Sequence, residues 1–68
     1  MAERQGTDSF IRPLLVTPLQ AAAMLNVSRT TLYYLTRDGR LTAVRIGRST
    51  RYAVAELEAY VRDLIRGT

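Results

Sequence analysis

The sequence predicts a small α+β domain that is mainly helical, with two short helices, a two-stranded hairpin and a C-terminal helix. Three observations lead to this prediction. Two helix-start signals follow each other closely, at Thr17 and Ser28. After Gly39 the spacing of apolar residues changes from a helical period to alternation. An apolar stripe with helical spacing then runs from about Val54 to Arg66.

The first helix is predicted to begin directly after Thr17. Thr17 is a good N-cap residue, Pro18 suits the first helical position, and Gln20 completes a capping box. Asn26 tolerates the left-handed conformation that ends a helix. Ser28 follows as a second N-cap, so two helices joined by about three residues form a helix-turn-helix.

The second helix is predicted to run from about Arg29 to Asp38, with Gly39 as its C-terminal stop. Leu32 and Leu35 share the face that must pack on the first helix. The opposite face carries groups that suit a nucleic-acid groove, namely Thr30, Tyr33, Tyr34 and Arg37, with Arg29 at its margin. Two alternatives stay open: that Tyr33 packs at the edge of the core, and that Arg37 only favours the helix C-terminus.

Alternation follows the second helix, with Val44 and Ile46 on one side of a strand and Arg45 on the other. A turn signal at residues 47–49 precedes a short return strand at residues 50–52. Three cationic side chains lie at or near the tip of this hairpin: Arg45, Arg48 and Arg51. These side chains repel one another unless an anion lies nearby. Because the hairpin directly follows a helix-turn-helix, we interpret it as a wing on a nucleic-acid backbone rather than as a solvated charged turn.

The third helix is predicted over about Val54 to Arg66. Its apolar stripe consists of Val54, Leu57, Val61, Leu64 and Ile65, with Tyr60 at the edge. We interpret this stripe as core, because one short helix cannot both close the domain and support a coiled coil of several heptads. Residues 1–13 are interpreted as a flexible N-terminal tail, and residues 14–68 as the domain.

Composition and charge favour a nucleic-acid partner and argue against an enzyme. The net charge is +4 and all ten cationic residues are arginine; the pI is ≈ 10.4. The chain has no Cys and no His, so a disulfide, a Cys/His zinc site and a His or Cys catalytic group are impossible. The six acidic residues are scattered, and there is no Gly-rich phosphate loop. We therefore expect a non-enzymatic protein without a cofactor or a metal.

The hydropathy pattern predicts a cytoplasmic protein with no membrane association. No apolar run approaches the roughly 18 residues of a membrane span. The first apolar run, at residues 10–16, is interrupted by Arg12 and Pro13, which argues against a signal peptide.

Two sequence runs carry a resemblance to a known family. The pattern A-A-x-x-L-x-V-S-R-x-T at Ala21 to Thr31 and the pattern L-x-A-V-R-I-G at Leu41 to Gly47 resemble the excisionase family of phage and mobile-element DNA-binding proteins, within the MerR-like winged-helix superfamily. The resemblance covers about Leu15 to Val61. It implies a winged helix-turn-helix, with a recognition helix at Arg29 to Arg37 in the major groove and a wing at Gly47 to Arg51 on the backbone or minor groove.

The candidate DNA-contacting residues follow from the patterns and the resemblance together. On the recognition helix they are Ser28, Arg29, Thr30, Thr31, Tyr33, Tyr34 and Arg37. On the wing they are Arg45, Arg48, Ser49 and Arg51.

The function expected from the resemblance is that of an excisionase, or recombination directionality factor. Such a protein binds and bends double-stranded attachment-site DNA and assists an integrase. Two alternatives are a small transcriptional regulator encoded by a prophage or plasmid, and an antitoxin or protein-interaction module that uses the Tyr-rich helix. One short domain reads only a few base pairs, and no long dimerising helix follows before Thr68. We therefore expect a monomer in solution that forms a cooperative array on DNA.

Overall fold

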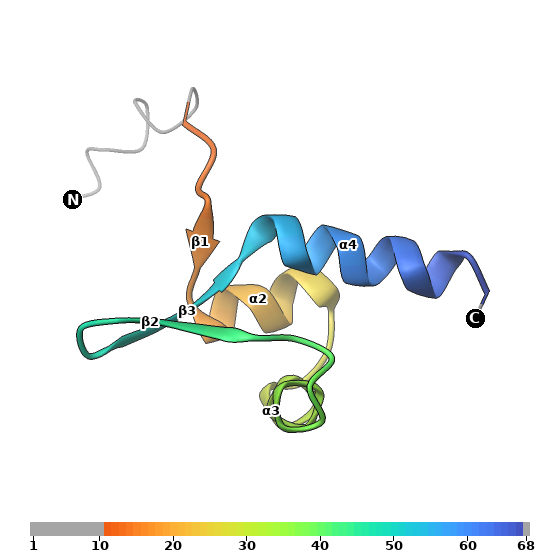
Figure 1. The fold of residues 1–68 in the computed structure, drawn as a ribbon, viewed down its shortest axis with the longest axis horizontal. Helices are drawn as coiled ribbons and strands as arrows, with labels where there is room; N and C mark the ends of the chain where they lie inside the picture. Colours follow the sequence, from red (N-terminus) through yellow and green to blue (C-terminus); the bar gives the residue numbers. More distant parts are fainter. Residues whose placement is uncertain (1–10, 68) are drawn as a thin grey trace.

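The computed structural model describes residues 11–67, and all of its regular structure lies between Leu15 and Ile65. Figure 1 shows the order of the elements along the chain. They are β1 (Leu15–Val16), α2 (Pro18–Leu25), α3 (Arg29–Arg37), β2 (Ala43–Ile46), β3 (Ser49–Ala53) and α4 (Val54–Ile65). The predicted winged helix-turn-helix, an α+β fold of three helices and a strand hairpin, is confirmed. Most of the predicted N-terminal tail, residues 1–10, lies outside the described residues.

Local hydrogen bonds start and end α2 as the sequence predicts. The backbone N–H of Gln20 donates to Thr17 Oγ1 over 3.1 Å, and the N–H of Thr17 donates to Gln20 Oε1 over 2.9 Å. Asn26 adopts φ 59° and ψ 44°, the left-handed conformation that ends the helix. The N–H of Val27 then donates to the carbonyl of Ala22 over 3.0 Å, which turns the chain toward α3.

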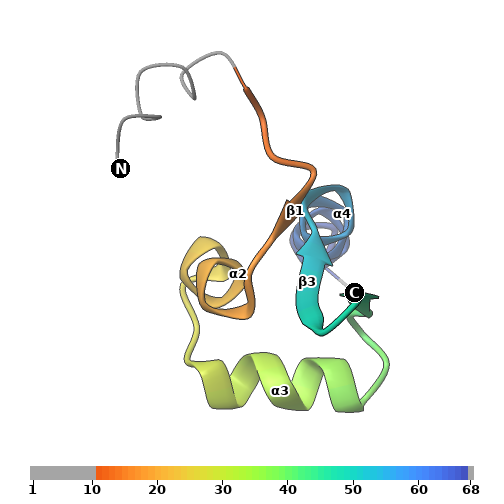
Figure 2. The same cartoon turned by 90° about the vertical axis from the view of Figure 1, so that its left-hand side faces the viewer.

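The second cap sets the direction of α3. Ser28 Oγ accepts from the N–H of Thr31 over 3.0 Å, and the helix ends at Arg37, one residue earlier than predicted. Gly39 follows with φ +83°, which favours glycine at this stop. Figure 2 shows α3 lengthwise below α2 and β3, and no other described element lies beyond it. One long side of α3 is therefore open to a ligand.

The predicted hairpin is present, and a short third strand joins it. The sheet is antiparallel with the order β1-β3-β2. Ile46 pairs with Ser49, so the turn consists of Gly47 and Arg48, and Ser49 belongs to β3 rather than to the predicted turn. Gly47 has φ +60°, and two-residue hairpins of type II′ place glycine at this first central position. Leu15 and Val16 form β1, which the sequence analysis did not predict because two residues show no periodicity.

The core lies where the helix-turn-helix meets the sheet. Its buried side chains come from β1, α2, α3, the α3–β2 connection, β3 and α4: Val16, Ala21, Ala22, Leu32, Leu41, Tyr52 and Leu57. Among them Tyr52 is the only one with a polar side-chain group, and its hydroxyl lies 2.8 Å from Thr36 Oγ1. This small core joins all of these elements, and the partly buried Ala43 of β2 packs against it.

The prediction that the whole apolar stripe of α4 belongs to the core is wrong for its C-terminal half. Leu57 is buried at 2% exposure, but Leu64 and Ile65 are 52% and 78% exposed. The reason is length: α2 has only eight residues and ends at Leu25, and Figure 1 shows α4 extending past it. Only the first half of α4 has a partner to pack against.

A backbone contact replaces the missing side-chain cap of α4. Ala53 occupies the N-cap position and cannot accept a hydrogen bond through its side chain. The N–H of Val54 donates instead to the carbonyl of Leu14 over 2.9 Å. The segment beside β1 therefore also satisfies the start of α4.

We expect Leu41→Ala to destabilise the domain far more than Ile65→Ala. Leu41 is 1% exposed, and emptying such a site costs about 2–5 kcal/mol, comparable with the whole net stability of a domain this small. Ile65→Ala removes an exposed side chain and should change the free energy of unfolding by less than about 0.5 kcal/mol. Urea unfolding followed by circular dichroism measures both. Similar losses in the two variants would show that the end of α4 is packed after all.

Candidate nucleic-acid interface

The open side of α3 presents the residues that the sequence analysis assigned to it. We call Thr30, Tyr33, Tyr34 and Arg37 the reading face. All four are exposed, with Tyr33 at 61% and Tyr34 at 46%. Tyr33 is therefore not a core residue, and the alternative that it packs at the core edge is wrong. The two rings lie side by side, with centroids 5.7 Å apart and planes tilted by 59°.

Arg37 sits in the last turn of α3 and has two neighbours on the surface. Its Cζ lies 4.7 Å from the ring centroid of Tyr34, a cation–π contact. Its Nε lies 3.5 Å from Asp38 Oδ1. The side chain is still 57% exposed, so these contacts orient the guanidinium without burying it.

The N-terminal turn of α3 combines capping with exposed polar groups. Ser28 and Thr31 are exposed, yet Ser28 Oγ donates to Thr31 Oγ1 over 3.1 Å in addition to its capping bond. These two predicted site residues thus have a structural role in starting the helix. Arg29 and Thr30 are also exposed, and they lie where a recognition helix enters a groove.

The strand register divides the wing arginines between the two faces of the hairpin. Side chains alternate along a strand, and paired residues share a face. Arg45 pairs with Thr50, two positions from the pair Ala43 and Tyr52, so Arg45 shares the sheet face of buried Tyr52. Because the Tyr52 hydroxyl reaches Thr36 of α3, this face is the one turned toward the recognition helix.

Arg51 lies on the opposite face of the hairpin. It pairs with Val44, is partly buried, and its Nη1 donates to the carbonyl of Thr50 over 2.8 Å. Arg48 is exposed in the turn, and Ser49 is partly buried at the start of β3. The three arginines that the sequence placed together near the tip therefore have different surroundings.

One hydrogen bond ties α3 to the wing. Thr36 Oγ1 donates its hydroxyl proton to the carbonyl of Leu32 over 2.9 Å. A threonine hydroxyl has a single proton, so the Tyr52 hydroxyl is the donor in the 2.8 Å bond to Thr36 Oγ1. The N–H of Thr42 donates to Glu56 Oε1 over 3.1 Å and attaches the start of the wing to α4.

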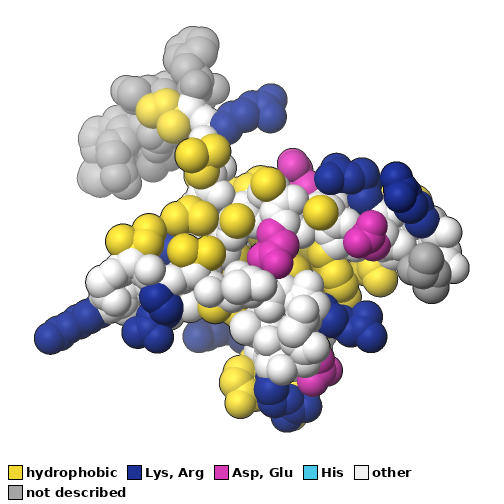
Figure 3. All heavy atoms as spheres, viewed as in Figure 1, with side chains coloured by type: hydrophobic (Ala, Val, Ile, Leu, Met, Phe, Trp, Pro, Cys, Tyr) yellow, Lys and Arg dark blue, Asp and Glu magenta, His cyan; other side chains and the backbone are white. Residues whose placement is uncertain are grey.

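Charge is distributed unequally over the domain. The chain from Arg29 to Ala53 carries six arginines against one aspartate, whereas α4 carries Glu56, Glu58 and Asp63 with Arg62. Figure 3 shows arginine side chains at the hairpin end and around α3, and others on the far part of α4 and near the N-terminal segment, with most of the acidic side chains toward α4. The segment from Arg29 to Ala53 is therefore more positive than α4, a charge distribution that suits a polyanionic partner.

Arg40 is a cation that the sequence analysis left out of the site. It lies in the connection between α3 and β2 and is exposed. Together with Tyr60, Asp63 and Leu64 it lines a shallow cavity beside α4. In the sequence, only its position directly after the helix stop could have suggested a role in binding. The structure places Arg40 beside α4 rather than on the reading face.

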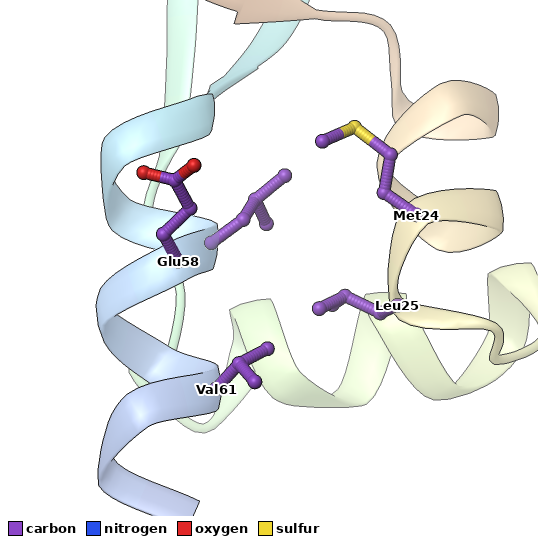
Figure 4. Close-up of a pocket in the computed structure, with 5 residues that line it drawn as sticks. Met24, Leu25, Glu58 and Val61 are labelled. Atoms are coloured by element: carbon purple, nitrogen blue, oxygen red, sulfur yellow. The ribbon is translucent and has the colours of Figure 1, made fainter.

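One groove in the described part of the chain lies between two helices and is mostly apolar. This groove between α2 and α4 is lined by Met24, Leu25, Leu57, Val61 and Glu58, with Glu58 as its only charged group (Figure 4). Within residues 11–67 no group of three or more His, Cys, Asp or Glu side chains could hold a metal ion. No helix in the same described part of the chain is long and apolar enough to cross a membrane.

Comparison with known proteins agrees with this geometry. Residues 15–64 match the family described as helix-turn-helix domain. Two Mycobacterium tuberculosis proteins, from strains CDC 1551 / Oshkosh and ATCC 25618 / H37Rv, are each 49% identical over 37 residues, which is 54% of this chain and 47% of theirs. Both are named, provisionally, as DNA-binding proteins. The chain spans about half the length of these curated relatives, and no solved structure matches it.

We expect Arg45→Ala and Arg51→Ala to differ in their effect on DNA affinity. Arg45 is exposed on the face turned toward α3, so its loss should weaken binding to any duplex and reduce the salt dependence by about one phosphate contact, or about 0.9 in slope. Arg51 is hydrogen-bonded to the Thr50 carbonyl on the other face, so its loss should leave both the affinity and the salt dependence nearly unchanged. Fluorescence anisotropy with a random-sequence duplex measures this. Equal losses would mean that the two faces of the wing bind DNA alike.

Proposed function

The chain belongs to the helix-turn-helix domain family, and from this premise we propose that it binds double-stranded DNA sequence-specifically as an excisionase-type recombination directionality factor. The DNA-binding part of this proposal rests on one observation: the reading face of α3 is open and lies beside the wing. The hydrogen bond between Thr36 and Tyr52 links the wing to α3. The excisionase part rests on the resemblance of the runs at 21–31 and 41–47. The role is one of binding, without catalysis, in the cytoplasm where the DNA lies.

The proposed binding mode places α3 in the major groove and the wing on the adjacent backbone. The arginine fork and the hydroxyls on the reading face match the donor and acceptor patterns of base edges. Arg45 and Arg48 are exposed and match the phosphate-anchoring role of a wing. The names of the relatives from M. tuberculosis support DNA as the partner.

The small size of α3 supports binding in several copies. At 1.5 Å per residue its nine residues extend about 13 Å, roughly four base-pair steps. So few base pairs give little specificity in a genome. We propose that several copies bind side by side on repeated attachment-region sites, bend the DNA and assist an integrase, the chain being a monomer when free. The apolar groove between α2 and α4 supports such protein contacts, since no residue of the reading face lines it.

Binding should depend strongly on salt. If Arg29, Arg45 and Arg48 meet phosphates, about three contacts give a slope of log K against log salt of roughly −2.7. Anisotropy titrations of the wild-type protein at several salt concentrations measure the slope. Affinity that does not change with salt would contradict the DNA-binding role itself.

The assembly should be cooperative only on DNA with repeated sites. We expect sedimentation to show a monomer, and gel shifts to show weak binding to a fragment with one site and cooperative filling of a fragment with several. The single-site fragment is the matched control, because it keeps the sequence and removes the neighbours. A stable free dimer that fills one palindrome without cooperativity would instead favour the transcriptional regulator, the second function considered from the sequence.

A further inference from the structure

Arg37 is held on the reading face by two different neighbours. We propose that it reads a guanine in the major groove, with Tyr34 and Asp38 as positioning residues that aim its guanidinium. This inference rests on the proposed DNA binding and adds the identity of one base that the chain reads. It starts from the two contacts of Arg37, with the Tyr34 ring and with the Asp38 carboxylate.

The two contacts leave one edge of the guanidinium available. The guanidinium carbon Cζ lies over the Tyr34 ring, 4.7 Å from the ring centroid. Nε is the nitrogen that faces Asp38, at 3.5 Å from Oδ1. The edge with Nη1 and Nη2 is therefore the part that can point away from the helix as a pair of parallel donors. Because the neighbours already restrict the side chain, ordering it on a ligand loses less rotamer entropy.

Asp38 makes Arg37 better suited to a base than to a phosphate. Asp38 is itself 54% exposed, so an approaching phosphate meets a carboxylate beside the guanidinium and the net attraction falls. A base edge carries no net charge and does not suffer this repulsion. Arg45 and Arg48 have no acidic neighbour along the strand hairpin and remain the better phosphate anchors.

A pair of donors selects one base in the major groove. Guanine presents two adjacent acceptors there, O6 and N7, whereas adenine presents the N7 acceptor beside an N6 donor. Cytosine presents a donor, and thymine a single acceptor beside a methyl group. The Nη1–Nη2 edge of Arg37 therefore fits guanine and meets a repelling donor or an incomplete match at every other base.

The test begins with the DNA that the wild-type chain prefers. Duplexes with a randomised central region are selected by the full chain, and the enriched duplex is then varied one base pair at a time in anisotropy titrations. We expect at least one position where G·C is preferred by roughly 5- to 150-fold. Arg37→Ala and Arg37→Lys should both lose this preference, since lysine keeps the charge but lacks the fork.

A modified base tests the contact at the level of atoms. Replacing the selected guanine by 7-deazaguanine removes the N7 acceptor and leaves base pairing intact. The wild-type chain should lose affinity for the modified duplex, whereas Arg37→Ala should bind both duplexes equally. Equal binding of both duplexes by the wild-type chain would overturn the proposal.

Further variants distinguish base recognition by Arg37 from a general loss of charge and from a loss of folding. Arg40→Ala makes the same charge change three residues away, beside α4, and should retain the guanine preference. Tyr34→Phe keeps the ring and should retain the preference, whereas Tyr34→Leu should weaken it at that one position. Thermal unfolding by circular dichroism confirms that each variant is folded. Loss of the preference in Tyr34→Phe would overturn the positioning role of the ring.

The outcomes distinguish guanine recognition by Arg37 from the proposed sequence-specific DNA binding on which it rests. If Arg37→Ala weakens binding to all sequences equally, Arg37 is a phosphate anchor and the guanine proposal fails, while sequence-specific DNA binding stands. If the wild-type chain enriches no sequence at all, both the sequence-specific function and the guanine proposal fail.

Discussion

One buried residue, Tyr52, connects the hairpin to α3 through both packing and a hydrogen bond. Its backbone lies in the central strand β3, where it pairs with Val16 of β1 on one side and Ala43 of β2 on the other. Its ring fills the core at 5% exposure, and its hydroxyl donates to Thr36 of α3. A buried tyrosine needs such a partner, since an unpaired hydroxyl in the core would be destabilising by about 1–3 kcal/mol. The Tyr52 side chain thus links the sheet to α3 by a hydrogen bond, in addition to the apolar packing of the core.

This constraint also decides on which face of the hairpin each cation lies. With Tyr52 pointing to the core, the alternation along β2 and β3 puts Arg45 on the α3 side and Arg51 on the other side. A slip of the β2–β3 register by one residue would exchange the faces of β2 and carry Arg45 away from α3. The two-residue turn at Gly47 and Arg48 prevents such a slip. The buried core and the tight turn therefore determine the charged surface.

Features built from neighbouring residues could be predicted from the sequence, and features that depend on distant partners could not. The caps at Thr17 and Ser28 and the helix stop at Asn26 involve residues three or four positions apart, so their signals are visible in the sequence. Strand β1 exists only because Ala53 and Tyr52 lie opposite it, and its two residues show no pattern of their own.

The candidate site shows the same division. The members of the reading face could be predicted because a helix repeats every 3.6 residues. The face on which Arg51 lies depends on its strand partner, and no residue near it in the sequence indicates this. In α4 the apolar stripe continues past the end of α2, so apolarity alone could not show that Leu64 and Ile65 are exposed.

The arginines of this chain differ in what they can do because they differ in what surrounds them. Arg51 donates a hydrogen bond to a backbone carbonyl, Arg37 contacts a ring and a carboxylate, and Arg40 lies beside α4. All three contribute to the net charge in the same way as Arg45 and Arg48. However, only exposed guanidinium groups that are not already bonded within the protein can bind phosphates and release counterions from DNA. The number of phosphate contacts should therefore be smaller than the number of arginines between Arg29 and Ala53. Affinity and specificity would then rest on different arginines, with the wing supplying attraction to any duplex and α3 supplying the choice of sequence.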